Sequence, residues 1–162
     1  MAGVKLLISG LPNTGKSTLI KDLDPSQALL ISRDGKKSPL KIPKVTIEEF
    51  TDVDDLIAQI TNGIGRYIEK TGTNPATIVI DSISKIFLDI ESRILAKVKS
   101  FPYGQINIEI AKFMEFLEHT IAPNCNLIMI SHSQLNTETN AYELVNAGGS
   151  WGKKGKPICL AA

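Results

Sequence analysis

The sequence predicts an α/β fold in which a mainly parallel β-sheet is flanked by helices. Two observations support this prediction. Short apolar runs alternate along the chain with longer segments whose apolar residues recur at helical spacing, and the first run leads into a glycine-rich loop and a helix. Strands joined by helical crossovers pair in parallel and are covered on both faces. We therefore expect helices on both faces of the sheet and a ligand site at the carboxyl ends of the strands.

The glycine-rich loop has the sequence GLPNTGKST over residues 10–18 and fits G-x-x-x-x-G-K-[ST], the P-loop pattern. A strand over residues 4–8 and a short helix over residues 16–22 give it the strand–loop–helix context that the pattern requires. Glycines let backbone N–H groups surround an anion, and the start of the helix adds a positive dipole end. A glycine-rich turn with a chance lysine is the alternative, which both the spacing and the context disfavour.

This pattern predicts an ATP site. Lys16 is expected to reach the β- and γ-phosphates and to act in catalysis, and the Ser17 hydroxyl is expected to bind Mg²⁺. The sequence has no N-K-x-D guanine-recognition pattern, which favours ATP over GTP. The residues predicted to hold the nucleotide are Gly10, Leu11, Pro12, Asn13, Thr14, Gly15, Lys16, Ser17 and Thr18.

The remaining elements follow in alternation. Strands are expected at residues 28–32, 45–47, 77–80 and 127–130. Helices are expected over the apolar positions of residues 53–67, 83–94 and 106–121. Thr51 is the expected N-cap of the first of these helices, and residues 101–104 break the pattern between the last two. Residues 33–44 are expected to form a basic loop, and a polar stretch beyond Ser131 leads to a last apolar run at residues 158–162.

A second motif lies at residues 77–82, where the sequence TIVIDS is an apolar strand that ends in an acid, as in the Walker B pattern. Asp81 is therefore expected to hold the Mg²⁺ shell opposite Ser17. An aspartate at this position could instead cap the helix that follows. The P-loop upstream favours the metal role.

Hydrolysis also needs a group that orients the attacking water. No glutamate directly follows Asp81, so acids that follow other strands are the candidates. Asp34 lies beyond the second strand, and Glu48 and Glu49 lie beyond the third. Each of the three could instead be a solvated surface acid.

Polar residues follow the strand at residues 127–130, in the sequence SHSQ. A side chain at this strand end can contact the γ-phosphate and report its loss, and His132 or Gln134 could do so. An ordinary polar loop is the alternative for this segment.

The segment NAGGSWGKKGK at residues 146–156 combines glycines, lysines and one aromatic residue. Trp151 could stack on a base of single-stranded nucleic acid while Lys153, Lys154 and Lys156 contact phosphates. A loop without such a role, or one that contacts a neighbouring subunit, is the alternative. The net charge of +1 argues against a strongly basic nucleic-acid binder, although it allows a local basic patch.

The composition is ordinary for a soluble globular protein, with 43% hydrophobic and 22% charged residues. At 162 residues the chain is long enough for one domain with its own core. Cys125 and Cys159 lie far apart and match no metal spacing, as expected for reduced thiols in a cytoplasmic protein. No apolar run has transmembrane length, and the first strand begins too early to leave room for a signal peptide. We therefore expect a cytoplasmic protein with no membrane partner.

Taken together, the segments GLPNTGKST, ALLISRD, TIVIDS, LIMISHSQ and NAGGSWGKKGK resemble those of the RecA-like ATPases. In size and style they are similar to the phage-encoded nucleotide-binding proteins of the Sak group of single-strand-annealing recombinases. The similarity covers about residues 3–160, and the P-loop is its specific motif. It implies that residues 1–162 form a single RecA-like ATPase core. Because the sequence stops within the apolar run at residues 158–162, we expect this core to be either truncated at its C-terminus or a minimal version of a larger fold.

The resemblance also implies roles for single residues. Asp34 lies near the water-activating glutamate of that family, and the change from glutamate to aspartate weighs against efficient hydrolysis. His132 falls near the polar residue that senses the γ-phosphate, and Gly148 and Gly149 fall in the DNA-contacting loop. The family forms rings or filaments with ATP between subunits, which implies a homo-oligomer.

We therefore expect a Mg²⁺-dependent ATPase that acts on single-stranded DNA in phage-type recombination or replication, within the host cytoplasm. Two other classes stay open: a nucleotide-dependent switch or assembly factor with little catalysis, and a small P-loop kinase. Such kinases usually carry an arginine-rich lid late in the chain, whereas the arginines here are Arg33, Arg66 and Arg93.

Overall fold

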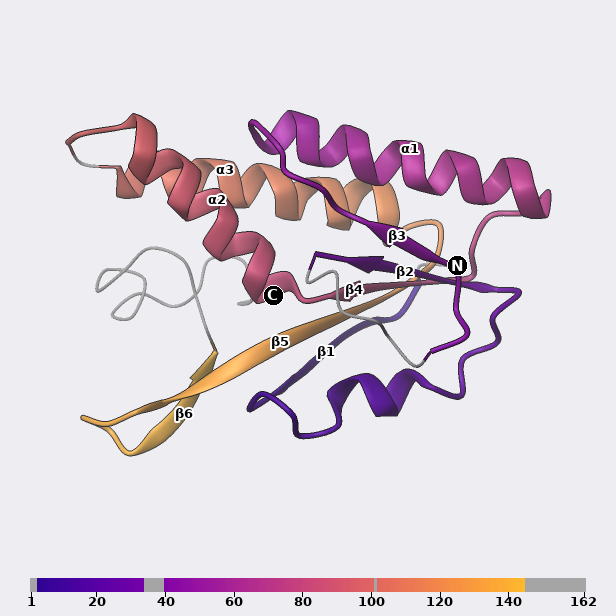
Figure 1. Ribbon diagram of the computed structural model, residues 1–162, viewed down its shortest axis with the longest axis horizontal. Helices are drawn as coiled ribbons and strands as arrows, with labels where there is room; N and C mark the ends of the chain where they lie inside the picture. The colour runs from indigo at the N-terminus through magenta and orange to yellow at the C-terminus, as the bar shows by residue number, and fades with distance from the viewer. Residues whose placement is uncertain (1–2, 34–39, 101, 145–162) are drawn as a thin grey trace.

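The computed structural model describes residues 3–33, 40–100 and 102–144, and this part of the chain has the predicted α/β fold (Figure 1). The strands follow the order β1-β5-β4-β2-β3 across the sheet, each parallel to its neighbour, and β6 pairs antiparallel with the far end of β5. The strands are β1 (Lys5–Gly10), β2 (Ala28–Ser32), β3 (Lys44–Thr46), β4 (Thr77–Asp81), β5 (Asn126–Asn136) and β6 (Ala141–Leu144). The helices are η1 (Lys16–Ile20), α1 (Val53–Thr71), α2 (Ile83–Lys97), α3 (Tyr103–Phe116) and η2 (Leu117–Ile121).

Helices cover the two faces of the sheet unequally. In Figure 1, α1, α2 and α3 lie along one face, and the short 3₁₀ helix η1 lies on the other. The residues of β2 and β4 alternate between the two resulting cores. Leu29 and Ile80 belong to the larger cluster beneath the three α-helices, whereas Leu30 and Val79 belong to a smaller cluster with Ile20 of η1. Burial on both faces explains why these strands are continuous apolar runs in the sequence.

Helix termini differ from the sequence prediction in one detail. The N-cap of α1 is Asp52 and not Thr51, because the Asp52 carboxylate accepts the Asp55 N–H at 2.8 Å. The Asp55 carboxylate in turn accepts the Thr51 N–H at 2.9 Å, so two side chains satisfy the free donors at this helix start. At α2 the cap is Ser82, which frees Asp81 from the capping role that the sequence left open.

Gly63 lies inside α1, where glycine ordinarily weakens a helix. Its position explains the residue, because a Cβ atom there would lie 2.6 Å from Cγ1 of Val45 in β3. The glycine therefore allows α1 to approach the sheet closely at the edge formed by β3.

The C-terminal part of the described chain departs further from the predicted elements. The helix expected over residues 106–121 divides into α3 and the π-helical turn η2. Strand β5 continues past Ser131 to Asn136 and forms a hairpin with β6, where the sequence predicted a polar connection. The hairpin lies beyond the part of β5 that is covered on both faces, so its residues lack the apolar pattern that marks a buried strand.

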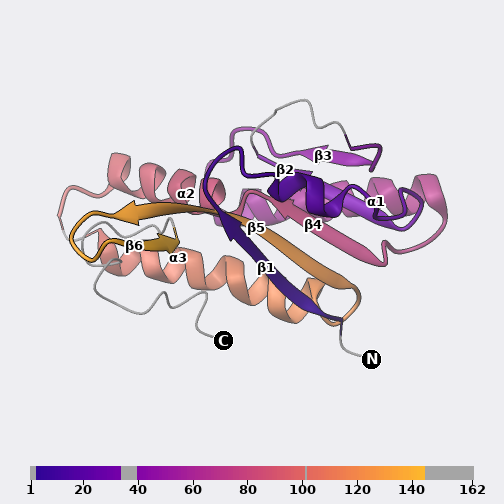
Figure 2. The ribbon, with the colours of Figure 1, turned by 90° about the horizontal axis from the view of Figure 1, so that it is seen from below.

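Strand β1 forms one edge of the sheet and, within the described residues, pairs with β5 alone. Figure 2 shows η1 over β2 and β4, with no helix in front of β1. The side chains of Val4 and Leu6, on this side, are 67% and 47% exposed. None of the helices in the described ranges is both long and apolar enough to cross a membrane.

Candidate nucleotide-binding site

The predicted site residues meet at the carboxyl ends of the strands. Gly10 at the end of β1 is the register partner of His132 in β5, and Asp81 at the end of β4 is the partner of Ile130 in the same strand. Strand β5 thus runs between the P-loop strand and the strand that ends in Asp81. Parallel strands bring their carboxyl ends to one edge, which is where α/β sheets bind ligands.

The P-loop follows β1 directly, and its backbone needs the glycines that the pattern supplies. Gly15, just before η1, has φ of 83°, in the left-handed region that glycine adopts without a steric cost. A Cβ atom on Gly10 would lie 3.0 Å from Oγ1 of Thr14, so a larger residue would crowd the loop. The Thr14 hydroxyl also donates to the Leu11 carbonyl at 2.7 Å and closes the loop on itself.

Lys16 lies inside this loop and is 8% exposed. Its Nζ atom donates to the Gly10 carbonyl at 2.9 Å and to the Leu11 carbonyl at 2.6 Å. Burial lowers the pKa of the Lys16 ammonium, and the nearby Asp81 carboxylate raises it, with burial the larger effect. The cation therefore points into the cradle where the pattern predicts phosphates, with loop carbonyls as its present partners.

Ser17 and Asp81 are adjacent, as the metal prediction requires. The Ser17 hydroxyl donates to Oδ2 of Asp81 at 3.1 Å, across a sequence separation of 64 residues. Mg²⁺ prefers oxygen ligands, and in phosphate sites it keeps several waters and takes one or two protein oxygens together with phosphate oxygens. These two oxygens fit that pattern. The described residues hold no cluster of three or more His, Cys, Asp or Glu side chains suited to a metal.

His132 is the next polar residue at this edge. Its Nδ1 atom is buried and has no hydrogen-bond partner, which is uncommon for a buried polar atom. Its backbone N–H donates to the Ser84 hydroxyl at 3.1 Å. Gln134 lies further out in the β5–β6 hairpin and is exposed. The geometry therefore favours His132 over Gln134 as a residue beside the phosphates.

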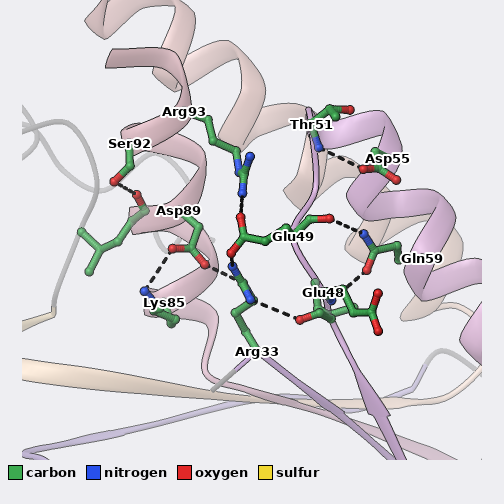
Figure 3. Close-up of polar contacts among 12 residues, drawn as sticks. Arg33, Glu48, Glu49, Thr51, Asp55, Gln59, Lys85, Asp89, Ser92 and Arg93 are labelled. Carbon is green, nitrogen blue, oxygen red and sulfur yellow. Dashed lines mark hydrogen bonds and ion pairs between the residues drawn. The ribbon is translucent and has the colours of Figure 1, made fainter. Parts of the chain in front are cut away.

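Glu49 lies in a network of charged side chains beside the ends of β2 and β3 (Figure 3). Arg33 donates to Glu49 at 2.9 Å and to Asp89 of α2 at 2.6 Å, and Arg93 of α2 also pairs with Glu49. The guanidinium of Arg93 lies over the Phe50 ring, 4.6 Å from its centroid. Hydrogen bonds from Arg33 and Arg93 hold the pKa of the Glu49 carboxyl below its ordinary value. The Glu49 carboxylate is thus paired with two arginines.

The other candidate acids lie differently. The backbone N–H of Glu48 donates to Oε1 of Gln59 in α1, at 3.0 Å. Asp34 lies outside the described residues, directly after Arg33. The backbone N–H of Arg33 donates to the Asp81 carbonyl at 3.0 Å, so the chain enters the Asp34 segment from a point beside Asp81.

The residues predicted to contact nucleic acid all lie outside the described part of the chain. They are Gly148, Gly149, Trp151, Lys153, Lys154 and Lys156. The segment that holds them follows β6, whose pairing with β5 starts directly after His132.

Two features of the site were missed by reasoning from the sequence. One is Ser84, a serine in an amphipathic helix, which no motif singles out. The other is Arg33, which follows β2 and forms hydrogen bonds with the segment after β3, with α2 and with the Asp81 carbonyl. The sequence does place Arg33 directly after a buried strand. A charged side chain at such a position needs hydrogen-bond or ion-pair partners, so this placement could have indicated the network.

Comparison with known protein families identifies an AAA domain. The AAA domain family matches residues 2–147. Among solved structures, the chain is similar to the P4 protein from bacteriophage phi6 in complex with ADP, with 15% identity and a TM-score of 0.43. That similarity covers 86% of this chain and 44% of the P4 chain, so this chain spans less than half the length of P4. No curated protein matches the chain. Because the family match extends over most of its residues, the chain belongs to the AAA domain family of P-loop ATPases.

Proposed function

We propose that the chain binds ATP with Mg²⁺ at the carboxyl ends of β1, β5 and β4 and hydrolyses it. The observation that carries the proposal is the hydrogen bond between Ser17 and Asp81 at 3.1 Å, beside the buried ammonium of Lys16. A P-loop alone indicates phosphate binding. A P-loop whose serine lies against the acid of a second strand provides the oxygen pair that a phosphate-bound Mg²⁺ uses.

Each residue has a distinct role in this proposal. The loop from Gly10 to Gly15 supplies backbone N–H groups around the phosphates, and Lys16 exchanges its carbonyl partners for phosphate oxygens. Ser17 and Asp81 hold the metal, which when bound neutralises charge on the terminal phosphates. Asp34 orients the water, and His132, through its unpartnered Nδ1, contacts the γ-phosphate.

The finer proposal concerns the partner. The resemblance to Sak-type recombinases supports a role on single-stranded DNA in phage-type recombination or replication, within the host cytoplasm. Stacking of Trp151 and phosphate contacts from Lys153, Lys154 and Lys156 would supply the affinity. The resemblance also supports a homo-oligomeric ring or filament with ATP between subunits.

A nucleotide-dependent switch with little catalysis is the second candidate. It is favoured by the engagement of Glu49 with Arg33 and Arg93, which removes one of the three acids that could orient the attacking water and leaves Asp34 and Glu48 as candidates. The two candidates share a nucleotide site and differ in turnover.

Release of phosphate from ATP, measured with and without single-stranded DNA, tests these proposals. We expect Mg²⁺-dependent release that increases when DNA is added. Tight ATP binding without release, with or without DNA, would support the switch. Transfer of phosphate to a small molecule, with no inorganic phosphate formed, would instead indicate a kinase.

Binding of DNA has its own measurement, because Trp151 is the single tryptophan of the sequence. We expect single-stranded DNA to quench its fluorescence. Stacking on an aromatic is worth about 1–3 kcal/mol per base, so Trp151→Ala should weaken binding about tenfold to a hundredfold at every salt concentration. Replacing the three lysines should instead mainly flatten the salt dependence. Equal DNA affinity of the Trp151→Ala protein would exclude this segment as the DNA site.

A further inference from the structure

We propose that Ser84 is a positioning residue that holds His132 at the nucleotide site. The inference rests on the proposed function, since it gives His132 a role beside the γ-phosphate. It adds a residue that no motif marks and that does not itself contact the nucleotide.

The first argument comes from the hydrogen-bond pattern of β5. Even-numbered residues of this strand direct their N–H groups to β4, as Asn126 does when it donates to the Ala76 carbonyl at 2.8 Å. The register partner of Ile130 is Asp81, the last residue of β4. The next N–H on this side, that of His132, therefore lies beyond the end of β4.

The chain that follows β4 offers no carbonyl to this N–H. A continuing strand would present the Ser82 carbonyl, but α2 begins here and the Ser82 carbonyl accepts the Ile86 N–H at 3.3 Å. The Ser84 hydroxyl accepts the His132 N–H instead, at 3.1 Å. Ser84 thus takes the place of a strand residue at the point where helix α2 packs against β5 (Figure 1).

Ser84 is itself held in place. It is 1% exposed, and its hydroxyl lies 3.4 Å from the Ser82 hydroxyl, to which it donates. Ser82 is fully buried and caps α2 by accepting the Lys85 N–H at 3.3 Å. Because Ser82 directly follows Asp81, two serines connect the backbone of His132 to the residue proposed to hold the metal.

The position of the His132 side chain matters for the proposed contact with the γ-phosphate. Its partner in β1 is Gly10, the first residue of the P-loop, and its Nδ1 is buried without a partner. A contact to a phosphate oxygen depends on the imidazole lying within hydrogen-bond reach, and a displacement of about 1 Å can cost about a hundredfold in rate. Without the Ser84 hydroxyl the part-buried His132 N–H would lose its hydrogen-bond partner, so β5 would shift to find another.

The test compares steady-state ATP hydrolysis by the full chain and by variants at Ser84, Ser92 and His132. Ser84→Ala should lower kcat about tenfold to a hundredfold and leave KM for ATP within about twofold, since the P-loop is unchanged. Ser84→Thr keeps the hydroxyl and should restore most of kcat. Ser92→Ala is the matched control, because Ser92 lies on the same helix with its hydroxyl bound to the Leu88 carbonyl, and its kcat should not change.

The variant His132→Ala separates this inference from the proposed function. If Ser84 acts through His132, then adding Ser84→Ala to His132→Ala should cause no further loss of kcat. A full additional loss in the double variant, or unchanged kcat in Ser84→Ala, would overturn the role of Ser84 while leaving the site intact. Unchanged kcat in His132→Ala would overturn the γ-phosphate role of His132 and this inference with it. Should Ser84→Ala fail to fold, Ser84→Cys, with its weak hydrogen-bonding thiol, should give an intermediate kcat, and wild-type kcat there would contradict the inference.

Discussion

Substitution by alanine should change the stability of the protein in opposite directions at two glycines of α1. Gly63→Ala and Gly65→Ala each add one methyl group within one helix, two residues apart. A Cβ atom on Gly65 would have no atom within 4 Å, whereas one on Gly63 would meet Cγ1, Cγ2 and Cβ of Val45 at 2.6, 2.8 and 3.2 Å. The two variants therefore share the helix-propensity effect and differ in packing.

The magnitudes follow from these contacts. Replacing glycine by alanine inside a helix stabilises by about 0.5–1 kcal/mol, which for a chain of this size raises Tm by about 1–4 °C. At Gly63 a rotation of Val45 cannot relieve the overlap, because its Cβ atom is also too close, so β3 must move. Overpacking of this kind costs about 1–3 kcal/mol. After the propensity gain, we expect Gly63→Ala to destabilise by up to about 2 kcal/mol.

Denaturant unfolding followed by far-ultraviolet circular dichroism measures both free energies of unfolding. The variant Val45→Ala supplies the control, since Gly63→Ala should be less destabilising in that background than in the wild type. If Gly63→Ala stabilised the chain as much as Gly65→Ala does, the close approach of α1 to β3 would be wrong.

Three further predictions concern the site and its charges. Lys16→Ala should abolish hydrolysis and weaken ATP binding in a folded protein, because it removes the cation of the cradle, and unchanged turnover would disprove the site assignment. Asp81→Asn should raise the Mg²⁺ concentration needed for half-maximal hydrolysis, and an Mg²⁺ titration identical to wild type would remove Asp81 from the metal site. The pKa of Glu49 is below its ordinary value of 4.5 when the chain is folded, so its contribution to stability is present above that value and is lost as pH falls through the folded pKa. Glu49→Gln should therefore make the free energy of unfolding less dependent on pH in the acid range, and an unchanged acid profile by denaturant titration would contradict the arginine contacts.

Local patterns were sufficient to predict the sheet and the P-loop. The apolar runs at β2 and β4 are buried on both faces, so each strand is marked by its own residues. The P-loop is equally local, since its glycines and lysine are needed by the loop itself. The pairing of Ser17 with Asp81 followed from the rule that parallel strands share one carboxyl edge.

Features that depend on contacts between distant segments could not be predicted. The hairpin after Ser131 is stabilised by pairing with β6 and not by an apolar pattern, so its sequence resembles a loop. Glu49 resembles a surface acid until Arg33 and Arg93 are brought to it from two other elements. The cap of α1 was misplaced by one residue because Thr51 and Asp52 are both good capping residues, and the backbone decides between them.

The position of β1 at the edge of the sheet has a consequence for how the protein behaves at high concentration. Odd-numbered residues of β1 direct their N–H and C=O groups away from β5, and no described strand pairs with them. Within the described residues this edge is open and exposes Val4 and Leu6, and an open edge is a template for strand addition by another chain, which natural proteins discourage with charged edge residues. Lys5 is the charge on this edge, and its ammonium lies 3.3 Å from a carboxylate oxygen of Glu118. Loss of that lysine should therefore promote aggregation through the same strand that leads into the nucleotide site.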